Sequence, residues 1–238
     1  MADLSIVIPC YNEAQNIPLI LERLKAVYDS CNDVEIILVD NGSSDNTAEV
    51  LKNNIDDKKY SFVTCHRVEN NIGYGNGILS GLKQAHGKYL AWTHADMQTD
   101  PVDVVTAYKV LKSENDEQCI VKGKRKNRGL LDNFFTFGMS IITLLFLKKW
   151  YHDINAQPKV FSREFYNKLD KAPHDFSLDL YLLFVAKSMK YKTLTIPVFF
   201  NKRQYGEAKG GGSLKTKWSL IKRTFSYILK LKTEYKIG

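Results

Sequence analysis

Short apolar runs alternate with helical segments along the first part of the chain. The runs at 4–8, 34–39, 61–65 and 88–93 have the length and composition of buried strands. Between them, apolar residues recur every three or four positions, as they do on one face of an amphipathic helix. Four strands that alternate with helices predict an α/β fold, with one doubly wound, mostly parallel sheet and helices on both of its faces.

The second half of the chain is less regular. Strands are predicted at 118–123 and 193–200, and a helix at 175–189. The strongly apolar run at 134–147 is shorter than the roughly 20 residues that cross a bilayer. The run at 214–236 mixes apolar residues at helical spacing with lysines and arginines, which is typical of a basic amphipathic helix. These last two segments either pack on the protein core or lie at a membrane interface.

Polar side chains follow three of the predicted strands. They lie at 11–13, at 40–41 and, after the fourth strand, at His94, Asp96 and Gln98. The carboxyl ends of parallel strands meet at the sheet edge where ligands of doubly wound folds bind. A carboxylate and an amide oxygen there suit a hard divalent cation, which could hold a diphosphate. The alternative is a polar loop whose side chains make local turn bonds.

The charge of the chain narrows the choice of partner. A net charge of +8 favours an anionic partner, such as a nucleotide, a nucleic acid or an acidic membrane surface. No nucleic acid is expected, because the basic residues are spread through loops and the C-terminal segment and form no recognised nucleic-acid motif. The glycines after the third strand do not form the GxGxxG pattern that follows the first strand of a dehydrogenase.

The cysteines and the N-terminus bear on the compartment. The four cysteines are scattered and form no CxxC pair, which argues against a zinc knuckle or a redox site and favours a reducing compartment. The chain starts at Met1 and enters a predicted strand at once, so no signal peptide is expected. Both observations favour a cytoplasmic location.

Four motifs in a fixed order resemble family 2 inverting glycosyltransferases with the GT-A fold. They are Ile-Val-Ile-Pro-Cys-Tyr-Asn-Glu at 6–13, Val-Asp-Asn-Gly-Ser-Ser-Asp-Asn-Thr at 39–47, Asn-Ile-Gly at 71–73 with three glycines after it, and His-Ala-Asp-Met-Gln-Thr-Asp-Pro at 94–101. The chain looks most like the branch with dolichyl-phosphate mannosyltransferases and polyprenyl-phosphate glycosyltransferases. The resemblance covers roughly residues 4–210.

The resemblance implies a domain organisation and an activity. A GT-A glycosyltransferase domain would span 1–212, with an acceptor and membrane-interface segment at about 124–152, and a basic amphipathic helix would span 213–238. The enzyme would move a hexose from GDP-mannose or UDP-glucose to a polyprenyl or dolichyl phosphate, as a peripheral protein on the cytosolic face of a membrane. Two alternatives stay open: a growing saccharide as the acceptor, and a non-catalytic glycosyltransferase-like binding module.

The resemblance also implies a donor site. Arg203 resembles the arginine of a mobile loop that meets the donor diphosphate, and Asn41 stands where a second acid is usual. The residues expected around the nucleotide sugar are Pro9, Tyr11, Asn12, Glu13, Asp40, Asn41, Gly73, Asp96 and Arg203. The asparagine at this position would alter the nucleotide preference.

A metal site follows from the same resemblance. The family motif is usually Asp-x-Asp followed by Gln; Asp96 and Gln98 match it, and His94 replaces the first Asp. The implied cofactor is a divalent cation, Mn²⁺ or Mg²⁺, and a neutral imidazole would favour Mn²⁺. His94 could instead bond the diphosphate or lie outside the metal site.

The acceptor site depends on the acceptor. Gly123 and Arg125 resemble the Gly-x-Arg segment of the family, and Arg125 with Arg128 is predicted to hold a lipid phosphate. A lipid phosphate is already an anionic nucleophile, whereas a sugar hydroxyl needs a general base, for which Asp179 is the candidate. The predicted catalytic residues are Asp96, Arg125, Asp179 and Arg203.

Overall fold

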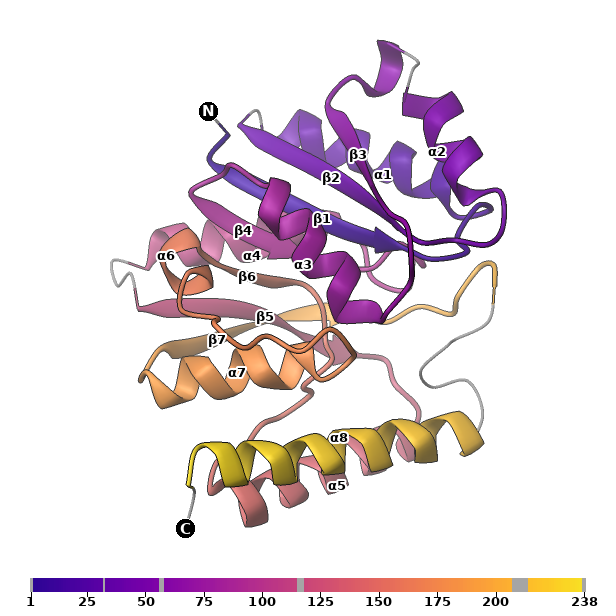
Figure 1. Ribbon diagram of the computed structural model, residues 1–238. Coiled ribbons are helices and arrows are strands. Elements are labelled where there is room, and N and C mark those ends of the chain that lie inside the picture. The colour runs from indigo at the N-terminus through magenta and orange to yellow at the C-terminus, as the bar shows by residue number, and fades with distance from the viewer. Residues whose placement is uncertain (1, 32, 56–57, 115–117, 207–213, 237–238) are drawn as a thin grey trace.

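One seven-stranded sheet organises the described part of the chain (Figure 1). The computed structural model describes residues 2–31, 33–55, 58–114, 118–206 and 214–236. The strand order is β3-β2-β1-β4-β6-β5-β7, and β6 runs antiparallel to both of its neighbours while the other pairs are parallel. The strands are β1 (Leu4–Cys10), β2 (Val34–Asn41), β3 (Val63–Val68), β4 (Tyr89–Trp92), β5 (Cys119–Lys126), β6 (Lys159–Ser162) and β7 (Lys192–Phe199).

Helices cover both faces of this sheet, as predicted. Ile6 of β1 is buried in one core cluster with residues of α1 and α4, and Val7 is buried in the other with residues of α3 and α7. Successive side chains of a strand point to opposite faces, so β1 serves both clusters. The helices are α1 (Ile17–Ser30), α2 (Thr47–Ile55), α3 (Tyr74–Gln84), α4 (Val102–Ser113), α5 (Leu130–Leu147), α6 (Arg163–Tyr166), α7 (Leu178–Ser188) and α8 (Leu214–Glu234), with a short 3-10 turn η1 (Lys58–Tyr60).

α5 and α8 lie side by side and form a further layer beside α7 (Figure 1). Phe146 of α5 packs edge-on against Phe225 of α8, with ring centroids 5.2 Å apart. Much of the apolar surface of α5 is exposed: Leu130, Leu131, Phe134, Phe137, Ile141, Leu144 and Leu145. Within the described residues, α5 is the one helix that is long and apolar enough to cross a membrane, by length and composition. It begins at Leu130, so the prediction of a run too short to cross was wrong about its length.

Two elements near the centre of the fold were missed from the sequence. No helix was predicted for α4, and no strand for β6. β6 has four residues and begins with Lys159, a charged residue that is fully buried. A lysine at that position hides the apolar pattern that identifies a buried strand. The helix predicted over 214–236 is confirmed as α8.

Gly81 of α3 lies where this helix touches the sheet. A Cβ atom there would come 2.4 Å from Cγ1 of Val7 and 2.7 Å from Cγ2 of Val39. We expect Gly81→Ala to force α3 away from the sheet and to lower the free energy of unfolding by about 1–3 kcal/mol in urea denaturation. Gly138→Ala in α5 is the matched control, because a Cβ atom there would meet nothing within 4 Å. Equal losses in both variants would contradict the tight contact at Gly81.

Candidate functional site

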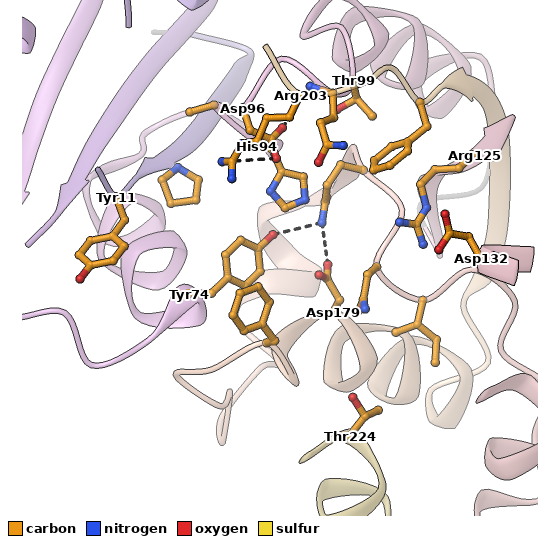
Figure 2. A pocket seen from close by; sticks show the side chains of 18 of the residues that line it. Tyr11, Tyr74, His94, Asp96, Thr99, Arg125, Asp132, Asp179, Arg203 and Thr224 are labelled. Carbon is orange, nitrogen blue, oxygen red and sulfur yellow. Dashed lines mark hydrogen bonds and ion pairs between the residues drawn. The ribbon is translucent and has the colours of Figure 1, made fainter. Parts of the chain in front are cut away.

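A cavity of about 680 Å³ lies at the carboxyl ends of the strands (Figure 2). Its walls come from the carboxyl ends of β1, β2, β3, β4, β5 and β7 and the segments that follow them, from the segment between α5 and β6, from the start of α7, and from α5 and α8. In Figure 2, Tyr11 lies at one end, Arg125 at the other, and Tyr74, His94 and Asp179 lie between them. The predicted site residues that line it are Pro9, Tyr11, Glu13, Asn41, Gly73, His94, Asp96, Gln98, Arg125, Arg128, Asp179 and Arg203. The fold thus brings most of the predicted residues to one cavity.

Arg203 lies between two carboxylates in this cavity. It pairs with Glu13, and its Nη2 atom is 3.7 Å from Oδ2 of Asp96. Oδ1 of Asp96 accepts the backbone N–H of Gln98 (3.1 Å). The side chain of Gln98 donates to the carbonyl oxygen of Asn201 (3.2 Å). These contacts tie the segment that carries Arg203 to the segment that follows β4.

The groups around Asp96 suit a divalent cation that takes some of its ligands from the protein and others from a substrate. Asp96, Gln98 and His94 offer a carboxylate, an amide and an imidazole to the cavity. Across the described ranges of the chain, no three His, Cys, Asp or Glu side chains gather closely enough to hold a metal ion by themselves. Mg²⁺ commonly binds through one or two carboxylates together with substrate phosphates. A cation here would therefore take its remaining ligands from water and from a substrate diphosphate.

His94 is part of a stack of rings. Its ring centroid is 5.5 Å from that of Tyr74, which is in turn 4.8 Å from that of Phe176. Burial lowers the pKa of His94, although the charge of Asp96 opposes this effect, so the imidazole is neutral at pH 7. A neutral imidazole retains a nitrogen lone pair, and His94 can therefore bind a cation or accept a hydrogen bond.

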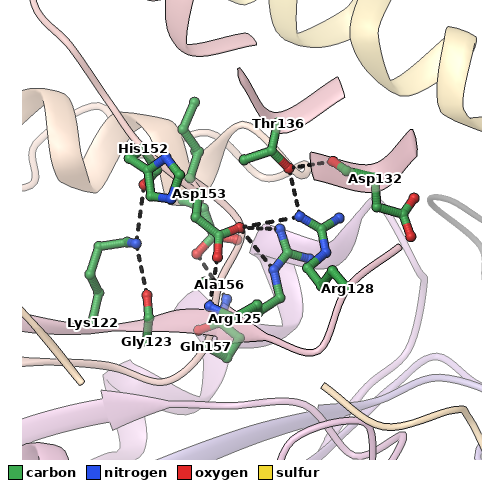
Figure 3. A network of polar contacts seen from close by, with 12 residues as sticks. Lys122, Gly123, Arg125, Arg128, Asp132, Thr136, His152, Asp153, Ala156 and Gln157 are labelled. Atoms are coloured by element: carbon green, nitrogen blue, oxygen red, sulfur yellow. Dashed lines mark hydrogen bonds and ion pairs between the residues drawn. The ribbon is translucent and has the colours of Figure 1, made fainter. Parts of the chain in front are cut away.

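Two arginines converge on Asp153 at the other end of the cavity (Figure 3). Nε of Arg125 donates to Oδ1 of Asp153 (2.8 Å), and its backbone N–H donates to Oδ2 (2.8 Å). Nη1 of Arg128 is 3.8 Å from the same carboxylate. Burial alone would raise the pKa of Asp153, but the charge and hydrogen bonds of Arg125 outweigh it and lower this pKa to about 2. Asp153 therefore stays ionised and fixes both guanidinium groups.

Asp179 is held by two buried side chains. Nζ of Lys159 and Nε2 of Gln157 lie 2.9 and 3.0 Å from its Oδ1 atom. Lys159 also donates to the carbonyl oxygens of Ile154 (2.9 Å) and Ala156 (2.8 Å). Three acceptors match the three N–H groups of a charged ammonium. Burial lowers the pKa of Lys159, and the charge of Asp179 opposes that shift.

Two predicted donor-site residues, Asp40 and Asn12, are not among the described residues that line the cavity. Asp40 is 1% exposed, pairs with Arg67 (2.7 Å) and accepts the backbone N–H of Ser43 (2.9 Å). Oδ1 of Asn12 accepts the backbone N–H of Ser44 (2.9 Å). Both side chains thus brace the loops after β1 and β2, beside the cavity.

Tyr74, Gln157, Lys159 and Phe200 are among the residues of this site to which the sequence assigned no role. Phe200 lies under the guanidinium groups of Arg125 and Arg128, 5.2 and 5.9 Å from its ring centroid. The signal for Lys159 was a single lysine in front of an apolar run, which marks a buried charge only when its partner is known. Tyr74 directly follows Gly73 of the Asn-Ile-Gly motif, and this position was the signal that could have identified it as a site residue.

Comparisons with known proteins agree with this geometry. The family model described as glycosyl transferase family 2 matches residues 5–177. Two curated relatives are named undecaprenyl-phosphate 4-deoxy-4-formamido-L-arabinose transferase: one from Proteus mirabilis (strain HI4320), 29% identical over 212 residues, and one from Photorhabdus laumondii subsp. laumondii, 29% identical over 210 residues. Each match covers 86% of this chain and 62% of the relative, so the chain spans less than two thirds of their length.

Two solved structures share the fold. Glucosyl-3-phosphoglycerate synthase from Mycobacterium tuberculosis, in complex with Mn²⁺, UDP and glucosyl-3-phosphoglycerate, is 15% identical with a TM-score of 0.74, over 96% of this chain and 79% of that one. A mannosyltransferase from Pyrobaculum calidifontis, in complex with GDP-Man and Mn²⁺, is 20% identical with a TM-score of 0.62, over 99% and 76%. These likenesses confirm the predicted GT-A fold.

The side-chain amide of Asn41 donates a buried hydrogen bond that a carboxylate cannot donate. Asn41 is 2% exposed, and its Nδ2 atom donates to the carbonyl oxygen of Gly73 (2.9 Å). In Asn41→Asp a carboxylate would face that carbonyl, so the free energy of unfolding should fall by about 3 kcal/mol at neutral pH. The loss should shrink towards about pH 4, where a protonated carboxyl group can donate again.

Chemical denaturation at the two pH values measures this effect. Asn53→Asp makes the same change at an exposed position of α2 and should alter stability little. Equal losses in the two variants, or a loss for Asn41→Asp that does not depend on pH, would contradict the role assigned to the amide.

Proposed function

The chain belongs to glycosyl transferase family 2, and we propose on this basis that it transfers a sugar from a nucleotide sugar to a polyprenyl phosphate. The observation that carries the proposal is the single cavity that joins the surroundings of Asp96 and Arg203 to Arg125 and Arg128. Each end offers guanidinium groups to an anionic substrate, and the cavity wall extends to α5 and α8. The names of the two curated relatives support a lipid phosphate as the acceptor.

The nucleotide sugar would bind at the Asp96 end. Tyr11 offers an aromatic face to the nucleotide, and Arg203 offers a guanidinium group to the diphosphate. A divalent cation, Mn²⁺ or Mg²⁺, held by Asp96 with Gln98 and His94, would neutralise the charge of the diphosphate leaving group. The Mn²⁺ in the two solved structures supports this part of the proposal.

The lipid phosphate would bind at the other end, against Arg125 and Arg128. One of its oxygen atoms attacks the anomeric carbon from the face opposite the diphosphate. The new C–O bond forms as the bond to the diphosphate breaks, and the nucleoside diphosphate leaves with the electron pair. The phosphate is already ionised, so no side chain has to remove a proton. The guanidinium groups reduce the repulsion between the two anionic substrates.

We further propose that α5 and α8 bind the cytosolic surface of a membrane, peripherally. α5 exposes a row of apolar side chains, among them Leu131 (67% exposed) and Phe134 (69%), and α8 exposes Trp218 (71%). Exposed lysines of α8, such as Lys222 and Lys230, favour anionic lipid headgroups. α5 packs beside this charged helix. A position of both helices in the plane of the membrane surface therefore fits them better than a transmembrane span.

An assay of sugar transfer tests the proposed function. Purified protein, Mn²⁺ and undecaprenyl phosphate are incubated with a panel of sugar nucleotides that starts with GDP-mannose and UDP-glucose, and lipids are analysed by mass spectrometry. We expect a glycosylated lipid. Arg125→Ala should lower kcat/KM about 100-fold, because the acceptor phosphate loses a bidentate partner. Arg23→Ala removes an arginine from a surface ion pair with Asp100 and should change kcat/KM little.

A saccharide acceptor would give a different pattern. Asp179→Asn would then abolish turnover while Arg125→Ala had a mild effect, and this result would overturn the lipid-phosphate proposal. Because Asp179 is the partner of a buried lysine, thermal melting must show that each variant is folded. A protein that binds UDP or GDP with Mn²⁺ and transfers no sugar to any acceptor would be a binding module.

The membrane proposal is tested by co-sedimentation with vesicles of phosphatidylcholine and phosphatidylglycerol. We expect the double variant Leu131→Glu, Leu145→Glu to bind at least about tenfold more weakly, because it places charges on the exposed face of α5. Tyr28→Glu is the control, since Tyr28 is 39% exposed on α1, and α1 packs in the other core cluster from α5 and α8. Equal losses for the two proteins would contradict the assignment of α5 as the binding surface.

A further inference from the structure

A chain of hydrogen bonds connects a buried lysine to the hydroxyl group of Tyr74, and the mechanism above does not use it. Nζ of Lys159 lies 2.9 Å from Oδ1 of Asp179, and Nε2 of Gln157 donates to the same oxygen (3.0 Å) and to the hydroxyl oxygen of Tyr74 (3.2 Å). Lys159, Gln157 and Asp179 are 0, 1 and 2% exposed. Tyr74 itself lines the cavity. Its hydroxyl group is thus positioned by side chains that solvent hardly reaches.

The chemistry of these bonds gives the Tyr74 hydroxyl a definite role. A carboxylate only accepts hydrogen bonds, so the amide of Gln157 must present its NH₂ group to Asp179. The same NH₂ group donates to the phenol oxygen, and the phenol proton is therefore directed to another acceptor. An ordinary phenol keeps its proton at neutral pH. Tyr74 is a neutral hydrogen-bond donor at the cavity wall.

The surroundings of Tyr74 indicate which kind of ligand group its hydroxyl group contacts. Arg125, Arg128 and Arg203 also line the cavity, and in Figure 2 Tyr74 lies between Tyr11 and Arg125. Its ring stacks on Phe176 (4.8 Å, 9°) and on His94 (5.5 Å, 27°). The carboxylates of Asp96 and Asp179 line the cavity beside Tyr74 and disfavour a phosphate there. An uncharged group with oxygen acceptors fits this zone, and ring faces suit the C–H groups of a sugar.

We infer that Tyr74 donates a hydrogen bond to an oxygen atom of the transferred sugar and thereby selects among nucleotide sugars. The inference rests on the proposed function, because it takes the sugar to lie between the diphosphate and the acceptor phosphate. Gln157, Asp179 and Lys159 are positioning residues that act through Tyr74. Asp179 then serves as an anchor of this chain of hydrogen bonds.

Calorimetric binding tests the inference without relying on turnover. Titrations in the presence of Mn²⁺ compare UDP with UDP-glucose and GDP with GDP-mannose, for the wild type and for Tyr74→Phe, which removes only the hydroxyl group. We expect the variant to bind the nucleoside diphosphate like the wild type and the matching sugar nucleotide about tenfold more weakly. Tyr28→Phe, on α1 and outside the cavity lining, should change neither affinity.

Monodeoxy sugar nucleotides identify the contacted oxygen. The wild type should bind one of them about tenfold more weakly than the parent compound, and Tyr74→Phe should bind the two alike. Gln157→Met should reduce the same discrimination, because it releases the hydroxyl group of Tyr74 from its partner.

The outcomes separate this inference from the proposed function. Equal sugar-nucleotide affinities for the wild type and Tyr74→Phe would overturn the inference, even if the protein glycosylates undecaprenyl phosphate. A variant that loses affinity for nucleoside diphosphates and sugar nucleotides by the same factor would show a merely structural hydroxyl and would also overturn it. The expected selectivity in a protein that leaves undecaprenyl phosphate unmodified would support the inference and overturn the proposed acceptor.

Discussion

Lys159 and Asp179 form a buried ion pair beside the cavity. Moving an ammonium group out of water costs several kcal/mol unless it is paired and its N–H groups are all bonded. Lys159 meets both conditions, with Oδ1 of Asp179 and the carbonyl oxygens of Ile154 and Ala156 as acceptors. The two carbonyl groups belong to the segment between α5 and β6. The requirement to satisfy one charge therefore fixes the path of that segment.

This segment contacts two residues that line different parts of the cavity. Asp153 at its start holds Arg125, and Gln157 at its end holds Tyr74. A Cβ atom on Gly123 would lie 1.9 Å from the carbonyl oxygen of Gln157, so only glycine allows β5 to approach this closely. Arg125, two residues further, lies on the same side of the strand and reaches Asp153. The Gly-x-Arg spacing thus has a physical cause in this fold. Gly123 lets β5 lie close to Gln157, and Arg125 then reaches Asp153.

Much of the fold and of the cavity rim could be predicted from the sequence, for local reasons. β1 and β2 are mostly apolar runs, and polar residues such as Tyr11 and Asp96 follow strands whose carboxyl ends must meet. What could not be predicted depends on partners distant in sequence. Asp40 pairs with Arg67 instead of lining the cavity, and β6 begins with a charged residue whose burial depends on its pairing with Asp179. Neither ion pair changes the spacing of apolar residues along the chain, so the sequence pattern does not indicate it.

The same ion pair bears on the nature of the acceptor. A general base must take up a proton during the reaction, and Asp179 is placed in the cavity wall where a base could act. Its carboxylate, however, is the counter-ion of Lys159, which is 0% exposed. The Oδ1 atom of this carboxylate also accepts a hydrogen bond from Nε2 of Gln157 (3.0 Å). A nucleophile that arrives already ionised leaves these contacts intact, because no side chain has to take up its proton. The electrostatics of the cavity thus favour a phosphate over a hydroxyl group as the acceptor.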